Sequence, residues 1–148
     1  MDILKGVVSK LRNTVEISGG GRDSGVTTTH VTIFHLDGQP VQLKSREAVL
    51  VDENDNVAVA GKVNNGIFNA YAYINNTTGV SGNIGMGIHF FFGIVFPVAG
   101  AFAINAFSDP FFGPMPKLIG AGFIGIGLYM LYKGIQISNA SKLLQLER

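Results

Sequence analysis

Two long apolar segments in the second half of the chain constrain its fold more than any other feature. Residues 84–107 carry no formally charged side chain over 24 residues, and residues 118–137 carry only Lys133. A helix of about 20 apolar residues crosses the roughly 30 Å of hydrocarbon in a bilayer. The sequence therefore predicts a transmembrane hairpin of two helices over these segments, with residues 108–117 as the external loop between them.

The composition agrees with a membrane protein and excludes several functional classes. Of 148 residues, 47% are hydrophobic, 14% are charged and 20 are glycine. A net charge of +1 with interspersed signs leaves no basic stripe to neutralise a phosphate backbone, so nucleic acid is not an expected partner. Because the chain has no cysteine, disulfides, thiolate catalysis and cysteine-ligated metals are excluded.

The distribution of basic residues predicts the orientation of the hairpin. The N-terminal stretch lacks the uninterrupted apolar core of a signal peptide. Basic side chains gather on the terminal sides of the two spans, whereas the loop offers Asp109 and Lys117. By the positive-inside rule, we expect a multi-pass protein of a bacterial-type inner membrane with both termini in the cytoplasm. The basic residues on the terminal sides of the spans are Lys44, Arg46, Lys62, Lys133, Lys142 and Arg148.

Residues 1–13 show the apolar spacing of one face of a helix. We expect a short amphipathic helix there, which either covers one end of the domain that follows or lies in the headgroup layer of the membrane. After the second span, residues 138–148 read as a cytoplasmic tail. The apolar residues of the N-terminal face are Ile3, Leu4, Val7, Val8 and Leu11.

Residues 14–79 change to short β-branched and aromatic runs separated by turn residues. The breaks include Gly19–Gly21, Asp37-Gly38 and Asn65-Gly66. Asp-Gly and Asn-Gly tolerate the positive φ of tight hairpin turns. The sequence therefore predicts a small all-β domain of five or six strands, closed into a barrel or a sandwich so that strand edges are hidden. Residues 80–87 read as a Gly/Ser linker into the first span.

The pattern of residues 57–76 is similar to part of a known fold. A valine-rich strand ends in Gly61, turns through Asn64-Asn65-Gly66 and returns as an alternating aromatic strand. This pattern resembles the closing strands of an OB-type barrel. In general plan, the chain is similar to membrane proteins that carry an OB-like domain beside transmembrane helices. The resemblance implies an OB-like barrel as the fold and supplies no functional residues.

Small residues in the spans predict helix packing. Glycines recur every seven residues, a spacing that keeps them on one seam of a helix, and a second small pair lies on an adjacent face. One face suits the other helix of the hairpin, and the second leaves room for another copy or another protein. The seam residues are Gly93 and Gly100 in the first span and Gly113, Gly120, Gly127 and Gly134 in the second half, and the second pair is Ala121 and Gly125.

Four further residues of the spans stand out by type. Pro97 lies in the middle of the first span and is a candidate hinge, because proline removes a helical hydrogen bond. His89 and Asn105 lie near the two rims of that span, where each side chain reaches an interface. Lys133 is expected to extend its ammonium group to the inner headgroups.

The β domain offers aromatic side chains as a candidate docking surface, although alternation requires some of them to be core. His30 and His35 are five residues apart and face opposite sides of a regular strand, a poor arrangement for a metal. Neither a catalytic constellation nor a cofactor motif is recognisable, so no enzyme activity, metal or cofactor is expected. The candidate docking residues are Phe34, Phe68, Tyr71 and Tyr73.

These features favour a non-enzymatic membrane protein that self-assembles as a scaffold or serves as an accessory subunit of a larger membrane protein complex. One alternative is a small oligomeric ion channel, with Pro97 as its hinge and the β domain as sensor. A second alternative is a membrane protein that senses a ligand through its barrel. The lipid bilayer is an expected partner in all three.

Overall fold

The computed structural model describes residues 1–19 and 26–146. The chain forms two compact units. The first combines Met1–Gly85 with Ile137–Arg148, and the second is Met86–Gln136. The first unit contains all six strands of the described residues, and the second contains most of the two long helices.

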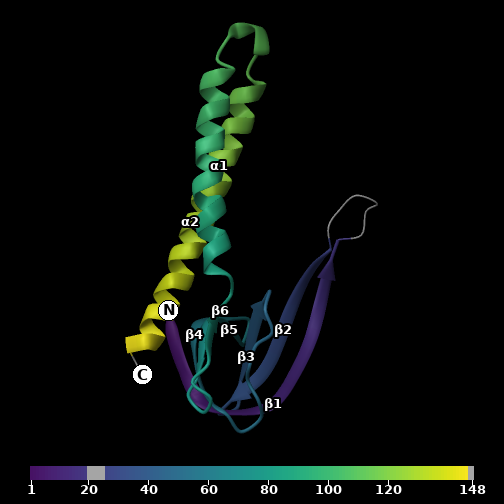
Figure 1. The fold of residues 1–148 in the computed structure, drawn as a ribbon, viewed down its shortest axis with the longest axis vertical. Coiled ribbons are helices and arrows are strands. Elements are labelled where there is room, and N and C mark those ends of the chain that lie inside the picture. The colour runs from purple at the N-terminus through teal and green to yellow at the C-terminus, as the bar shows by residue number, and fades with distance from the viewer. Residues whose placement is uncertain (20–25, 147–148) are drawn as a thin grey trace. The chain divides into compact units, whose positions relative to one another are not determined.

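Strands β1 to β5 close into a barrel in which each is hydrogen-bonded to two neighbours in the ring. Strand β1 pairs with both β2 and β4, β2 pairs with β3, and β4 pairs with β5, all antiparallel. The parallel pairing of β3 with β5 closes the ring, and β6 adds to β5 beyond it. The predicted OB-like barrel is confirmed (Figure 1). The strands are β1 (Asp2–Ser18), β2 (Thr27–Leu36), β3 (Gln39–Ser45), β4 (Asn56–Asn64), β5 (Ile67–Asn75) and β6 (Ser81–Asn83).

Two of the predicted hairpin turns are confirmed. Asp37 and Gly38 have φ angles of 48° and 87°, and Asn65 and Gly66 have φ angles of 51° and 79°. Two successive residues at positive φ match the right-handed twist of the strands that they join, which is why these dipeptides make tight hairpins. Of the predicted break at Gly19–Gly21, Gly20 and Gly21 lie outside the described residues.

The predicted N-terminal amphipathic helix is wrong, because residues 2–18 form strand β1. Leu4 and Val8 lie on the inner face of this strand by simple alternation, and Val8 is 1% exposed. The pairing register then shifts between Ser9 and Arg12, where Lys10 has a φ of 53°. This bulge turns the next inward position to Leu11, which packs against the same core. A strand with a bulge therefore reproduces the apolar spacing of a helix.

Inside the barrel, a single cluster of apolar side chains fills the space between the strands. Its aromatic members come from β2 and β5, and its aliphatic members come from every strand of the ring and from the segment before β4. The segment Val49–Val51 contributes two of these side chains, so this connection is part of the core. The buried members are Val8, Phe34, Leu36, Val41, Leu43, Val49, Val51, Val57, Val59, Phe68, Ala70 and Tyr73.

A buried polar pair fixes the segment before β4 to the end of β5. Asn75 is 0% exposed, and its Nδ2 donates to Asp55 Oδ2 at 2.6 Å and to the Leu50 carbonyl at 3.3 Å. Its Oδ1 accepts from the backbone amides of Thr77 and Thr78 at 3.0 and 3.2 Å. One side chain thus satisfies polar groups from two loops.

Substitution of Asn75 by alanine is expected to lower the free energy of unfolding by about 3 kcal/mol, because it leaves several buried polar groups without their partner. Thermal melting of the full chain in detergent, followed by circular dichroism, measures this loss. Asn76→Ala is the matched control, because Asn76 is exposed. Equal melting temperatures for the two variants would contradict the structural role assigned to Asn75.

The two helices are α1 (Met86–Ala106) and α2 (Met115–Leu146), and a short 3-10 helix, η1 (Pro110–Phe112), lies between them. Both long helices have the length and composition to cross a membrane. Buried residues make up only 11% and 17% of their most apolar stretches, whereas a core helix of a soluble domain is mostly buried. The predicted helical hairpin is therefore present, and Figure 1 shows α1 and α2 side by side, joined at one end.

The chain on either side of the hairpin differs from the prediction in two places. Residues 81–83, expected in a linker, form β6 on the edge of β5. The described part of the expected C-terminal tail continues helix α2 to Leu146. Ala140 and Leu144 are buried against small side chains of β4 and β5. Their spacing lets one helical face cover that side of the sheet, so the tail is a structural part of the barrel unit.

Candidate functional site

The seam of glycines lies between the two helices of the hairpin. Gly100 and Gly120 are both buried, and a β-carbon at Gly120 would lie 2.6 Å from the carbonyl oxygen of Gly100. A β-carbon at Gly100 would in turn overlap the carbonyl oxygen of Gly120. The two backbones therefore touch at this point, and only glycine fits on either side. Lipid tails are as apolar as leucine, so this close approach is what holds two helices together in a membrane.

Pro97 packs into the seam at the next glycine along α2. The ring carbon Cδ of Pro97 occupies the space that a β-carbon at Gly127 would need. At the other end, a β-carbon at Gly93 would lie 2.7 Å from the Leu131 side chain. Helix α1 continues through Pro97 to Ala106. The proline therefore has a packing role inside the hairpin, and its role as a hinge stays a prediction.

Gly134 completes the seam, and Gly113 does not belong to it. A β-carbon at Gly134 would be 3.4 Å from His89 Cβ and from the Phe90 ring, an ordinary van der Waals distance. Gly113 lies before α2 begins, with a φ of 64° and no atom within 4 Å of its β-carbon position. Its sevenfold spacing from Gly120 is therefore coincidental, because Gly113 supplies a positive φ in the loop before α2.

A second small-residue surface of α2 points away from the seam. We call Ala121, Gly122 and Gly125 the outer small face. All three are exposed, and β-carbons at Gly122 and Gly125 would meet no atom of the described chain within 4 Å. The sequence prediction included Ala121 and Gly125 but missed Gly122, although its spacing of three from Gly125 places the two on one helical face.

The polar residues of the spans have partners close at hand. Asn105 Nδ2 donates to the Ala101 carbonyl at 2.8 Å, one turn back in its own helix. Lys133 Nζ lies 5.9 Å from the centre of the Tyr129 ring, within the range of a cation–π contact. His89 is half-buried in the first turns of α1, beside Gly134. The roles of these three residues at the membrane rims stay predictions.

The candidate aromatic docking surface is wrong for three of its four residues. Phe34, Phe68 and Tyr73 are 0%, 3% and 6% exposed and belong to the barrel core. The hydroxyl of Tyr73 accepts a hydrogen bond from the Leu50 amide at 3.3 Å. Only Tyr71 is half-exposed, and it packs beside the small-residue side of β4 and β5. Inward alternation along β2 and β5 leaves no exposed aromatic pair among these four residues.

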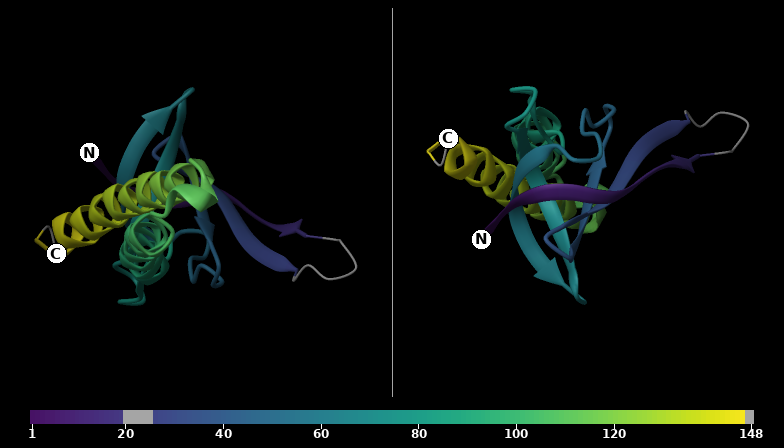
Figure 2. Two further views of the ribbon diagram at one scale, coloured as in Figure 1. Left: turned by 90° about the horizontal axis from the view of Figure 1, so that it is seen from above. Right: turned by 90° about the horizontal axis from the view of Figure 1, so that it is seen from below.

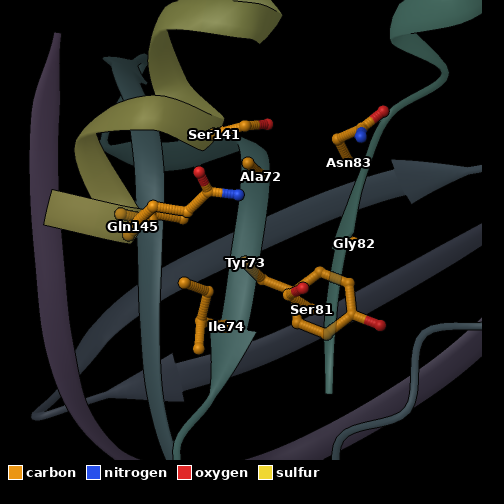
Figure 3. A pocket seen from close by; sticks show the side chains of 9 residues that line it. Ala72, Tyr73, Ile74, Ser81, Gly82, Asn83, Ser141 and Gln145 are labelled. Carbon is orange, nitrogen blue, oxygen red and sulfur yellow. The ribbon is translucent and has the colours of Figure 1, made fainter. Parts of the chain in front are cut away.

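A small cavity lies between the last turns of α2 and strands β5 and β6. It measures about 110 Å³ and has no charged side chain in its lining (Figure 3). Ser141 Oγ is buried beside it without a hydrogen-bond partner in the described chain. A space of this size holds a few water molecules, which would satisfy that hydroxyl. The lining is Ala72, Tyr73, Ile74, Ser81, Gly82, Asn83, Ser141, Leu144 and Gln145.

Within residues 1–19 and 26–146, no group of three or more His, Cys, Asp or Glu side chains is placed to hold a metal ion. In comparisons with protein-family models, curated proteins and solved structures, the chain matches none of them. The functional assignment therefore rests on the sequence and the geometry, and the two faces of α2 are the features that carry it.

Proposed function

We propose that this chain is an integral membrane protein of a bacterial-type inner membrane, with its barrel and both termini in the cytoplasm. It acts without catalysis, either as a self-assembling scaffold or as an accessory subunit of a larger membrane complex. The observation that carries the proposal is the outer small face of α2, formed by Ala121, Gly122 and Gly125, which is exposed beside a seam already filled by α1.

The physical argument follows from how helices associate in lipid. A helix gains nothing from burying leucine against another helix instead of against lipid, but it gains dispersion contacts where backbones approach closely. In α2, the seam at Gly120 and Gly127 supplies this approach for α1. The outer small face supplies the same kind of surface for a second helix, from another copy or from another protein.

Exposed apolar side chains support the membrane assignment. Phe91 and Phe102 on α1 are 61% and 69% exposed, and Phe111 in η1 is 89% exposed. Aromatic rings at such positions are costly in water and favourable against acyl chains or at the interface. Protease accessibility of tags at the two ends of the chain, in sealed inside-out and right-side-out vesicles, tests the proposed topology.

Replacing Gly122 and Gly125 together with leucine is expected to reduce the mass of the solubilised complex, because the larger side chains prevent close approach of a second helix. Native mass spectrometry of the tagged full chain in mild detergent, with identification of copurifying proteins, measures the effect. Ala99→Leu is the control, since Ala99 is an exposed small residue on α1. Unchanged mass and unchanged partner recovery in the Gly122/Gly125 double variant would contradict the proposal.

The channel and ligand-sensing alternatives stay predictions. Pro97, the hinge that a channel would use, packs against Gly127, and Asn105 is hydrogen-bonded within its own helix. Neither observation favours a polar pore along α1. Ion flux from purified protein in liposomes is the measurement that would revive the channel.

A further inference from the structure

Strands β1 and β2 continue past the rest of the barrel as a two-stranded ribbon. Strand β4 pairs with β1 only from Asp2 to Val7, and β3 pairs with β2 only from His30 onward. Between Arg12 and Ser18, β1 is therefore bonded to β2 on one edge, and no described strand pairs with its other edge. Figure 2 shows the ribbon extending away from the other strands, most clearly in its right panel.

An edge of this kind is a template for pairing with another chain. Val15 and Ile17 on β1 and Val26 beside β2 are 49%, 68% and 65% exposed. The segment from Arg12 to Ser18 contains no proline, and the bulge of β1 lies before it. Proteins usually protect such edges with prolines, bulges or inward charges, and a ribbon of only two strands is marginal in water. The edge lacks these protections along the stretch where its apolar side chains are exposed.

We infer that this edge of β1 pairs antiparallel with the same edge of a second copy, across a two-fold axis at Thr14. The inference rests on the proposed self-assembly and names one of its interfaces. In this register Arg12 of each chain lies directly opposite Glu16 of the other, so the pairing forms two complementary charge contacts. An interface in which the same surface meets itself is what two-fold symmetry requires, and opposite charges directly across two strands are favourable.

Neighbouring registers are less favourable for electrostatic or steric reasons. An axis at Glu16 would place the two Glu16 carboxylates against each other, and an axis at Val15 would leave Arg12 opposite Ser18. The pairing at Thr14 is confined to residues 12–16, whereas an axis at Asn13 would bring Glu16 opposite Lys10 and extend the pairing onto the occupied edge at residues 9–11. There the Leu11 amide donates to Glu53 Oε1 at 3.3 Å, and Lys10 has left-handed backbone geometry. Of these registers, only the one at Thr14 places Arg12 opposite Glu16 on the part of the edge that no described strand occupies.

Glu16 already has one cationic partner within its own chain. Lys44 Nζ on β3 lies 3.0 and 3.1 Å from the two oxygens of the Glu16 carboxylate. Arg12, Thr14 and Glu16 alternate along β1 and so lie on one face of the ribbon. In the paired state, each Glu16 carboxylate lies between Lys44 of its own chain and Arg12 of the second copy. These exposed charges select the register, while backbone pairing and the membrane hairpins supply the affinity.

The absence of cysteine from the chain makes a direct test simple. Residues directly opposite on antiparallel strands have Cα atoms roughly 4.5–5.5 Å apart, within reach of a disulfide. Thr14→Cys in native membranes is therefore expected to give a disulfide-linked dimer under mild oxidation. Glu16→Cys alone is expected to give little dimer, because the two positions lie roughly 13 Å apart along the strands. A mixture of Arg12→Cys and Glu16→Cys chains is expected to cross-link.

Charge reversal tests the register independently. In the Thr14→Cys background, Arg12→Glu places two carboxylates opposite each other at each contact and is expected to lower the dimer yield about tenfold. Adding Glu16→Arg together with Lys44→Glu exchanges the charges, keeps the contact between positions 16 and 44, and is expected to restore the yield. Lys62→Glu, an exposed charge reversal on β4, is the control and should leave the yield unchanged.

The outcomes separate this interface from the proposed function. If Thr14→Cys forms no dimer while native mass spectrometry of the unmodified chain shows an oligomer, the edge pairing is wrong and self-assembly through the helices stands. If the unmodified chain is a monomer without copurifying protein, the proposed function fails as well. A dimer yield at Thr14→Cys that the charge-reversal substitutions leave unchanged would contradict the register at Thr14.

Discussion

Replacing Gly120 with leucine is expected to separate the two helices of the hairpin. A side chain at this position must occupy space held by the Gly100 carbonyl oxygen and by Ile104 Cγ1, each 2.6 Å from the β-carbon position. Backbone atoms of a packed helix cannot rotate away, so the helices must move apart. Overpacking of this kind costs about 3 kcal/mol or more.

Cysteines introduced into both helices can measure the loss of contact between α1 and α2. The rings of Phe96 on α1 and Phe123 on α2 have centroids 5.4 Å apart. Short thiol-reactive cross-linking between cysteines introduced at both positions reports whether the helices still approach. In the Gly120→Leu background, the intramolecular yield should fall about tenfold or more, the factor that corresponds to a loss of at least 1.4 kcal/mol.

Gly122→Leu is the matched control for this experiment. The same change is made two residues away on the same helix, at a site where a β-carbon meets no described atom within 4 Å. Its cross-linking should equal that of the parent chain. Equal cross-linking in the Gly120→Leu and Gly122→Leu variants would show that the seam does not hold the hairpin. The comparison also keeps the test of the seam separate from the test of assembly, which uses the outer small face.

Replacing Gly61 with alanine is expected to destabilise the barrel strongly. A β-carbon at Gly61 would overlap the carbonyl oxygen of Asn69 and lie 2.9 Å from the Ala70 Cα. The clash is with the backbone of the paired strand, at the register shift between β4 and β5. Relief requires strand separation, for a cost of about 3 kcal/mol. In a unit of this size, the melting temperature should fall by about 10–20 °C.

Gly38→Ala separates steric overlap from backbone strain in the same measurement. Gly38 has a φ of 87° and open space at its β-carbon position, so the only cost of alanine there is the strain of a positive φ. Its cost should be about 1 kcal/mol. Circular dichroism of the full-length variants in detergent measures both. A smaller drop in melting temperature for Gly61→Ala than for Gly38→Ala would be inconsistent with the close approach of β4 and β5.

The barrel and the hairpin were predictable because their signals are local. Asp37-Gly38 and Asn65-Gly66 make tight turns wherever they occur between strands, and an uncharged stretch of 24 residues suits a span whatever lies around it. The N-terminal strand was not predictable in this way. Its apolar spacing fits a helix, and only pairing with β2 and β4, together with the bulge at Lys10, makes Leu4, Val8 and Leu11 face the barrel core and leaves Val7 exposed.

The candidate site was also predicted only in part, because residue spacing along one helix is a local signal and the burial of a strand residue is not. The sevenfold spacing predicted a packing surface that includes the glycines at positions 93, 100, 120, 127 and 134, which lie against the other helix of the hairpin, and Gly113, which lies before α2. The burial of Phe34, Phe68 and Tyr73 depends on which face of each strand meets the core. That choice follows from pairing between strands distant in the sequence, so the aromatic docking surface could not be rejected from composition alone.

The sequence by itself determined which segments are apolar helices, where the strands turn and that small residues would mediate helix packing. These properties follow from residue type and spacing within one segment. Only the tertiary structure decided that β1 is a strand and that the seam at Gly100 and Gly120 is filled by the hairpin itself. It also decided that no described residue covers the outer small face and that no described strand pairs with the edge of β1 from Arg12 to Ser18. Each of these depends on which backbone approaches which, and that approach is a property of contacts between segments.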